Sequence, residues 1–242
     1  MTVNSYDFAF ARKKELKRKI LLIVCIFLLT MICLQLIFHF FLSPVLILSS
    51  SMKPGLVKNA ALFILPLAPD RPDFFSTENL NRGDIVRVEA PEKNQLNFFE
   101  KVLEVSVAML TFQRVHPFTV LPSGCPPTAL FRLIGLPGDI LYIDDYVVYI
   151  KKAGTSHFLT EFELSSADYN ILIDNFPAMW DRAMGAPGKM PPITLGKDEY
   201  FVLCDNRISA FDSRLFGPVR ASEISGKALF QYYPFTDIKK LY

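Results

Sequence analysis

The feature that constrains this chain most is an uninterrupted apolar run directly behind a basic N-terminus. Residues 1–19 carry six Lys or Arg side chains against two carboxylates, and the following run from Ile20 to Leu42 contains no charged residue. A helix needs about 20 apolar residues to cross the hydrocarbon core of a bilayer. A cleavable signal peptide has an apolar region of only about 7–15 residues before a small-residue cleavage site. We therefore expect a permanent transmembrane helix over residues 20–42.

The distribution of charge predicts the orientation of this anchor. Basic residues stay on the cytoplasmic side of a membrane, so residues 1–19 are expected in the cytoplasm and residues 43–242 outside the cytoplasmic (inner) membrane. Beyond residue 19 the chain holds 20 basic against 22 acidic side chains. A nearly neutral domain of this kind argues against a nucleic-acid partner, which would require a basic surface.

Beyond the anchor, short runs rich in β-branched and aromatic residues alternate with turn residues, which is typical of strands. The predicted strands are Asp84–Glu89, Leu130–Ile134, Ile140–Ile143, Tyr146–Ile150, Glu199–Leu203 and Ala228–Tyr233. The pair Asp144-Asp145 predicts a tight hairpin between the third and fourth runs. Because the strands do not alternate with long helices, we expect a mainly β fold built on an antiparallel sheet.

Two segments interrupt this pattern and are interpreted as insertions. Residues 97–118 are apolar with scattered charges, which suits an amphipathic segment at the membrane surface or, as the alternative, a core helix. Residues 158–192 are mixed in character and are expected to pack on the β core. Cys125 and Cys204 both lie where a disulfide could form, and the sequence leaves their pairing open. No CxxC motif or His/Cys cluster supports a metal or cofactor site.

Four segments carry motifs in a fixed order. They are Leu48–Leu56 (LSSSMKPGL), Arg82–Val86 (RGDIV), Phe131–Asp139 (FRLIGLPGD) and Cys204–Arg214 (CDNRISAFDSR). Together with the preceding anchor they resemble the boxes of the type I signal peptidases, over most of residues 20–233. The resemblance implies an antiparallel signal peptidase-like core and a serine endopeptidase that removes signal peptides from exported proteins.

The resemblance also implies a role for each matched residue. Ser51 is the nucleophile, and Ser49 donates its hydroxyl to the oxyanion. Asp205, Arg207, Asp212 and Arg214 are implied to be paired charges that brace the strands of the site. In this family a buried, neutral lysine takes the proton of the nucleophile, because burial lowers its pKa.

This chain departs from the family pattern at the base. The lysine position is Phe131, the serine that would hydrogen-bond the lysine is Ala210, and the leading glycine of the last box is Cys204. Ser209 is one place off, and in a strand it would point the other way. Loss of the lysine together with its partner indicates that the pocket was refilled as a unit by apolar groups, which leaves no unpaired polar group behind.

Other residues are weak substitutes for the base. Arg132 has no acceptor lone pair and should face the opposite side of its strand. His116 and His157 titrate in a suitable range but fall in the insertions. Lys53 and Lys58 follow Ser51 closely and are expected to be solvated.

Two functions therefore remain open. The first is a signal peptidase I-type endopeptidase with Ser51 served by an unconventional base. The second is a catalytically silent homologue that binds signal-peptide-like segments by strand addition, as an assembly or chaperone factor. In both, the partners are signal peptides of exported preproteins and the lipid bilayer.

The predicted topology can be tested on intact cells. Protease added from outside should remove the mass that follows the anchor, because residues 43–242 are expected outside. A cytoplasmic protein that stays intact in the same sample controls for lysis. Protection of the whole chain would contradict the predicted orientation.

Overall fold

The computed structural model describes residues 5–67, 76–88, 97, 99–100, 103, 106–107, 111, 129–173, 186–208 and 211–241. Within these ranges the side chains of residues 5–12, 35–40 and 129 lie outside the description. The chain divides into two compact units, residues 1–41 and 42–242.

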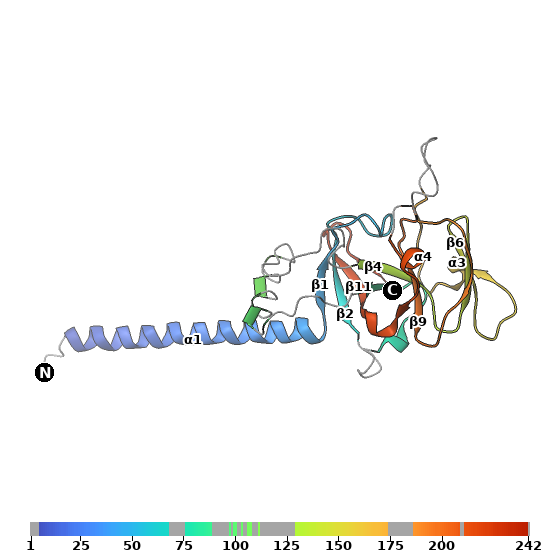
Figure 1. Ribbon diagram of the computed structural model, residues 1–242. Helices are drawn as coiled ribbons and strands as arrows, with labels where there is room; N and C mark the ends of the chain where they lie inside the picture. The colour runs from blue at the N-terminus through green and yellow to red at the C-terminus, as the bar shows by residue number, and fades with distance from the viewer. Residues whose placement is uncertain are drawn as a thin grey trace. The chain divides into compact units, whose positions relative to one another are not determined.

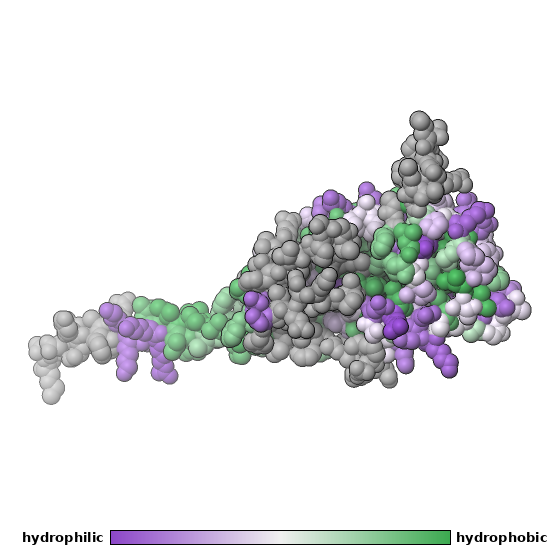
Figure 2. Space-filling model, viewed as in Figure 1, coloured by the Kyte–Doolittle hydropathy of each residue, from purple (hydrophilic) through white to green (hydrophobic). Residues whose placement is uncertain are grey.

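The first unit is the helix α1, Ser5–Phe40. Its basic residues and the apolar residues that follow them form separate stretches along the helix axis (Figure 2). Lys19 pairs with Glu15 at 3.0 Å on an exposed face, one turn apart. Among the described residues, no helix carries an apolar stretch that is long enough to cross a membrane.

The second unit is built on a large sheet. The described residues give it eight strands, in chain order β1 (Ser43–Leu46), β2 (Ala61–Pro66), β3 (Ile85–Val88), β4 (Ala129–Gly135), β9 (Glu199–Leu203), β10 (Val219–Arg220), β11 (Ile224–Tyr233) and β12 (Lys239–Lys240). They lie in the spatial order β1-β2-β11-β3-β4-β9-β10, and β12 pairs with β11 (Figure 1).

A smaller sheet of four strands has the order β7-β6-β5-β8. Its strands are β5 (Ile140–Asp144), β6 (Val147–Lys151), β7 (Leu159–Thr160) and β8 (Met190–Thr194). The short helices of the described residues are η2 (Thr77–Asn79), α3 (Glu161–Leu164), α4 (Ser213–Phe216) and η4 (Ala221–Glu223). Every pair of these strands is antiparallel, which confirms the predicted mainly β, antiparallel fold.

The strand β4 is buried on both of its faces. Phe131 and Leu133 belong to one hydrophobic cluster, whereas Leu130 and Ile134 belong to two others. Arg132 lies between these last two in sequence and is also buried. Because side chains alternate along a strand, Phe131 and Arg132 face opposite layers of the domain.

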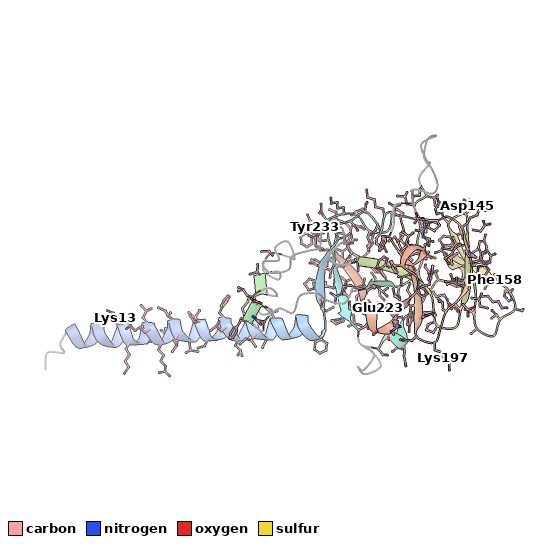
Figure 3. All side chains as sticks on the ribbon, in the orientation of Figure 1. Lys13, Asp145, Phe158, Lys197, Glu223 and Tyr233 are labelled. Atoms are coloured by element: carbon pink, nitrogen blue, oxygen red, sulfur yellow. The ribbon has the colours of Figure 1, made fainter. Side chains whose placement is uncertain are left out.

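The predicted hairpin is present, but its turn is one residue further along the chain. Asp144 pairs with Val147, so the two-residue loop is Asp145-Tyr146. Figure 3 labels Asp145, the first of these two residues. Both loop residues have positive φ, 47° and 66°. This is the requirement of a type I′ turn, whose twist matches that of the flanking strands. Aspartate tolerates the left-handed conformation. The prediction from the Asp144-Asp145 pair is therefore only one residue away from the observed turn.

The two expected insertions have different outcomes. Most of residues 97–118 lies outside the described residues. Of residues 158–192, the described parts contribute β7 and the first residues of β8 to the smaller sheet, and they also form the short helix α3. Thr160 and Glu163 form a capping box that starts α3, because each satisfies a backbone or side-chain group at the first turn.

A buried ion pair fastens this insertion to the large sheet. Arg207 follows β9 and pairs with Glu161 at the start of α3, and both side chains are at most 1% exposed. The Tyr169 hydroxyl donates to the same carboxylate at 2.6 Å. Burial raises the pKa of Tyr169, so the phenol stays protonated and keeps its role as donor. The insertion therefore supplies the charge that balances a buried arginine.

Replacement of Glu161 tests this dependence. Glu161→Gln removes the countercharge and leaves Arg207 buried alone, which costs about 3–5 kcal/mol in comparable buried pairs. We expect a loss of that size in the free energy of unfolding of the full chain, measured by denaturant titration in detergent. The matched control is Glu78→Gln, an exposed carboxylate, which should change stability by less than about 0.5 kcal/mol. Equal effects of the two changes would contradict a supporting role for Glu161.

Candidate functional site

The three serines lie in a loop that leaves β1 and is anchored by two buried side chains. Met52 and Leu56 are at most 1% exposed, and the Leu56 amide donates to the Met52 carbonyl at 2.9 Å. Ser50 is exposed, whereas Ser49 and Ser51 are partly buried. The loop thus presents Ser49 and Ser51 from a backbone that is held by the core.

Backbone and side-chain bonds join the four motif segments in pairs. The Asn206 amide donates to the Ser51 carbonyl at 2.9 Å, which links the first segment to the last. The Arg82 guanidinium donates to both carboxylate oxygens of Asp139 at 2.7 and 2.6 Å, which links the second to the third. The first and last segments therefore meet at Ser51, and the second and third meet at Asp139.

The hydroxyl of Ser51 has two side-chain partners among the described residues. Its oxygen lies 2.8 Å from the Ser49 hydroxyl oxygen, and either group can be the donor. The other partner is the side chain of Cys204, which stands where the related motif has glycine. The structure thus places the side chains of Ser49 and Ser51 next to each other and adds Cys204, a third residue that was not expected to contact Ser51.

The thiol of Cys204 is not a base at physiological pH. Cys204 is 2% exposed, and burial raises the pKa of its thiol to about 12. A group with this pKa remains neutral well above pH 9, so it does not take a proton from a serine hydroxyl. Cys204 is a free thiol; Cys125, its conceivable disulfide partner, lies outside the described residues.

Phe131, at the position of the missing lysine, is part of a buried apolar cluster, which we call the apolar wall. Phe131 is 5% exposed and packs in one cluster with Cys204, Leu133 and Val202. Its ring meets the edge of the Phe216 ring at 5.8 Å between centroids. A phenyl ring has no basic group and cannot accept a proton from Ser51.

The apolar wall continues to the surface on α4 and on Phe211, two residues before the helix. Phe211 packs against Phe216, with 5.6 Å between ring centroids. Phe211, Leu215 and Phe216 are all exposed by more than a third, and apolar side chains gather on this face of the domain (Figure 2). The wall at Phe131 is therefore the inner part of a larger apolar area.

The other proposed bases do not reach Ser51 in the described residues. Lys53 and Lys58 are exposed, and His157 is exposed on the segment between β6 and β7. His116 and Ala210, with its neighbour Ser209, lie outside the described residues.

Arg132 faces away from Ser51, as predicted. Its Nε and one terminal nitrogen donate to the two carboxylate oxygens of Asp205, both at 2.6 Å, and the other terminal nitrogen donates to the Gly83 carbonyl at 2.6 Å. The guanidinium carbon also lies 4.1 Å from the centroid of the Tyr169 ring, a cation–π arrangement. Both members of the ion pair are at most 4% exposed.

Asp212 and Arg214 form a second buried pair close to Cys204. Arg214 donates to both oxygens of Asp212 at 2.9 and 2.7 Å and to the Arg207 carbonyl at 2.8 Å. Asp212 in turn accepts from the Cys204 amide at 3.2 Å. The four charged residues that the resemblance singled out are thus all buried, and their partners are Arg132, Glu161 and each other.

Sequence reasoning missed two members of this network, Glu161 and Tyr169. Both lie in the insertion, outside the four motif segments. The capping-box pattern from Thr160 to Glu163 marks a helix start, but it carries no sign that Glu161 turns inward to a buried arginine.

A cavity of about 480 Å³ lies on the Arg132 side of β4 and not at Ser51. Its lining includes Gly55, Arg132, Tyr169 and Lys239. Lys239 crosses from β12 to donate to the Gly55 carbonyl at 2.9 Å, which ties the end of the serine loop to the C-terminal strand. The lining thus includes Pro54 and Gly55 at the end of the serine loop but not Ser51.

The sequence of this chain is similar to those of one known protein family and of several of its members. The family described as signal peptidase, peptidase S26 matches residues 18–233. Signal peptidase I of Bacillus licheniformis is 26% identical over 203 residues, which are 83% of this chain and 82% of that protein. Signal peptidase I P of Bacillus subtilis subsp. natto is 25% identical over 232 residues, 95% and 98% of the two chains.

A third relative matches more closely over a shorter stretch. Signal peptidase I V of Bacillus subtilis (strain 168) is 35% identical over 118 residues, which are 48% of this chain and 65% of that protein. Because the family match extends over most of the sequence, from the apolar run to the end of β11, the chain belongs to the signal peptidase, peptidase S26 family.

Proposed function

We propose that this chain binds signal-peptide segments of exported preproteins at the outer face of the cytoplasmic membrane and does not hydrolyse them. The observation that carries the proposal is the surroundings of Ser51. The base position is the buried ring of Phe131, and the described side-chain partners of Ser51 are Ser49 and Cys204. None of these groups accepts a proton at neutral pH.

Hydrolysis and binding make different demands on such a site. Without general-base catalysis a serine nucleophile loses roughly 10²–10⁴ in rate. Binding of an extended peptide needs an unpaired strand edge and pockets for alternate side chains. The ladder between β4 and β9 begins at Arg132, whereas β3 pairs with β4 from Ala129 onward. Among the described residues, the first residues of β4 therefore have no pairing partner on the β9 side, and we propose this edge as the place for an added strand.

The proposed anchor supports the same function. The uncharged run Ile20–Leu42 with its basic flank is proposed to hold the domain at the bilayer. Ser51 follows Leu42 by nine residues, which span at most about 30 Å when fully extended. A site this close to the anchor is restricted to segments that emerge at the membrane surface, as a signal peptide does.

A second candidate function, hydrolysis with Ser51 as nucleophile, is favoured by one observation. Ser49 and Ser51 keep the hydroxyl pair of a nucleophile and an oxyanion donor, at 2.8 Å. In that case the base would have to come from outside the described residues.

Ser51→Ala distinguishes the two functions in cells that carry only this copy of the gene. If the chain is a binder, processing of an exported protein is unaffected, and binding of a signal peptide to the full chain in detergent stays within about twofold. A bulky charged residue, as in Ser51→Arg, should abolish that binding. The control is Ser50→Ala, because Ser50 is exposed in the same loop. Processing that is lost in Ser51→Ala and kept in Ser50→Ala would overturn the binding function in favour of the endopeptidase.

A further inference from the structure

Cys204 and Phe131 pack in the same buried cluster. The antiparallel ladder of β4 and β9 ends at the pair of Arg132 with Leu203. Phe131 therefore lies on β4 just beyond the ladder, and Cys204 follows the last residue of β9. Because Cys204 also contacts the Ser51 side chain, a longer side chain at position 131 that reaches toward Ser51 has to share this space with Cys204.

The sulfur of Cys204 already takes the place beside the Ser51 hydroxyl. The two side chains are hydrogen-bonded. The backbone on both sides is fixed, because the Cys204 amide donates to Asp212 at 3.2 Å and the Asn206 amide donates to the Ser51 carbonyl at 2.9 Å. Asp212 is itself held by Arg214. The backbone that carries the thiol is therefore held by a buried ionic network.

We infer that Cys204, in addition to Phe131, blocks this site. Its thiol fills the space beside Ser51 that a base would need, so that a lysine introduced at position 131 is kept away from the Ser51 hydroxyl. The inference rests on the proposed function, in which the site binds peptide without turnover. It predicts that lysine and its serine partner are not sufficient for hydrolysis, and that a smaller residue at position 204 is required as well.

The same geometry does not favour a nucleophilic role for the Cys204 thiol. Thiolates, not thiols, are nucleophiles, and the apolar surroundings of Cys204 hold its pKa at about 12. The chemistry that the thiol retains is a weak hydrogen bond to Ser51 and the exclusion of other groups by its volume.

Turnover of a fluorogenic signal-peptide substrate by the full chain in detergent tests the inference. The double change Phe131→Lys with Ala210→Ser is the reference from which the effect of position 204 is measured. Addition of Cys204→Gly should raise the rate by roughly 10²–10⁴, the usual contribution of a general base. The gain should vanish with Ser51→Ala and should increase with pH as the new lysine loses its proton, which a merely structural effect would not produce. Cys33→Ala, in the apolar run of α1, is the control for loss of a thiol elsewhere.

Three results would overturn the inference. The double change could gain as much as the triple change, Cys204→Gly alone could gain as much, or the triple change could bind peptide and remain inactive. If glycine at this position prevents folding, Cys204→Ala removes only the sulfur and the same comparison decides. Failure of the proposed function has a different signature, because then the wild-type chain and the variants all fail to bind the signal peptide.

Discussion

The ion pair between Arg132 and Asp205 fixes the geometry on which the site depends. Its two hydrogen bonds join β4 to the segment that follows β9, with both side chains removed from water. Each member is the immediate neighbour in sequence of a residue that faces the other layer, Phe131 and Cys204. Because a bidentate pair has a defined geometry, it holds β4 against the segment after β9, where Phe131 and Cys204 pack in one cluster.

The alternation of a single strand separates two kinds of chemistry in this protein. On one face of β4 lies an ionic frame that the resemblance to the signal peptidases led us to expect. On the other face, only one residue away, lies an apolar wall where that family has its base. Exchange of the residues on one face leaves the other intact, because adjacent side chains of a strand do not share neighbours. A family member can thus keep its framework while its reactive centre changes.

Much of the fold follows from sequence pattern, and the elements and contacts that the pattern did not predict were missed for physical reasons. β9 and the hairpin of β5 and β6 were predicted closely, since their alternation and turn residues are local signals. β2 was missed because Ala61–Pro66 is buried on nearly every residue, which removes the alternation. Cys204 was identified as a departure, but its contact with Ser51 depends on strand register across the whole domain. Ala210, the other predicted part of the refilled pocket, lies outside the described residues.

The buried carboxylate of Glu161 has a consequence for how this domain can be recombined. The insertion looks like a separable module in the sequence, because it lies between motif segments that carry the family resemblance. Arg207 belongs to the last of those segments, yet its countercharge belongs to the insertion. In a chimera that takes this insertion from a relative, the Arg207 guanidinium would be buried without a countercharge. The exception is a relative whose insertion places a carboxylate where Glu161 lies. The two members of this ion pair therefore lie on opposite sides of the boundary between the motif segments and the insertion, so the insertion cannot be exchanged independently.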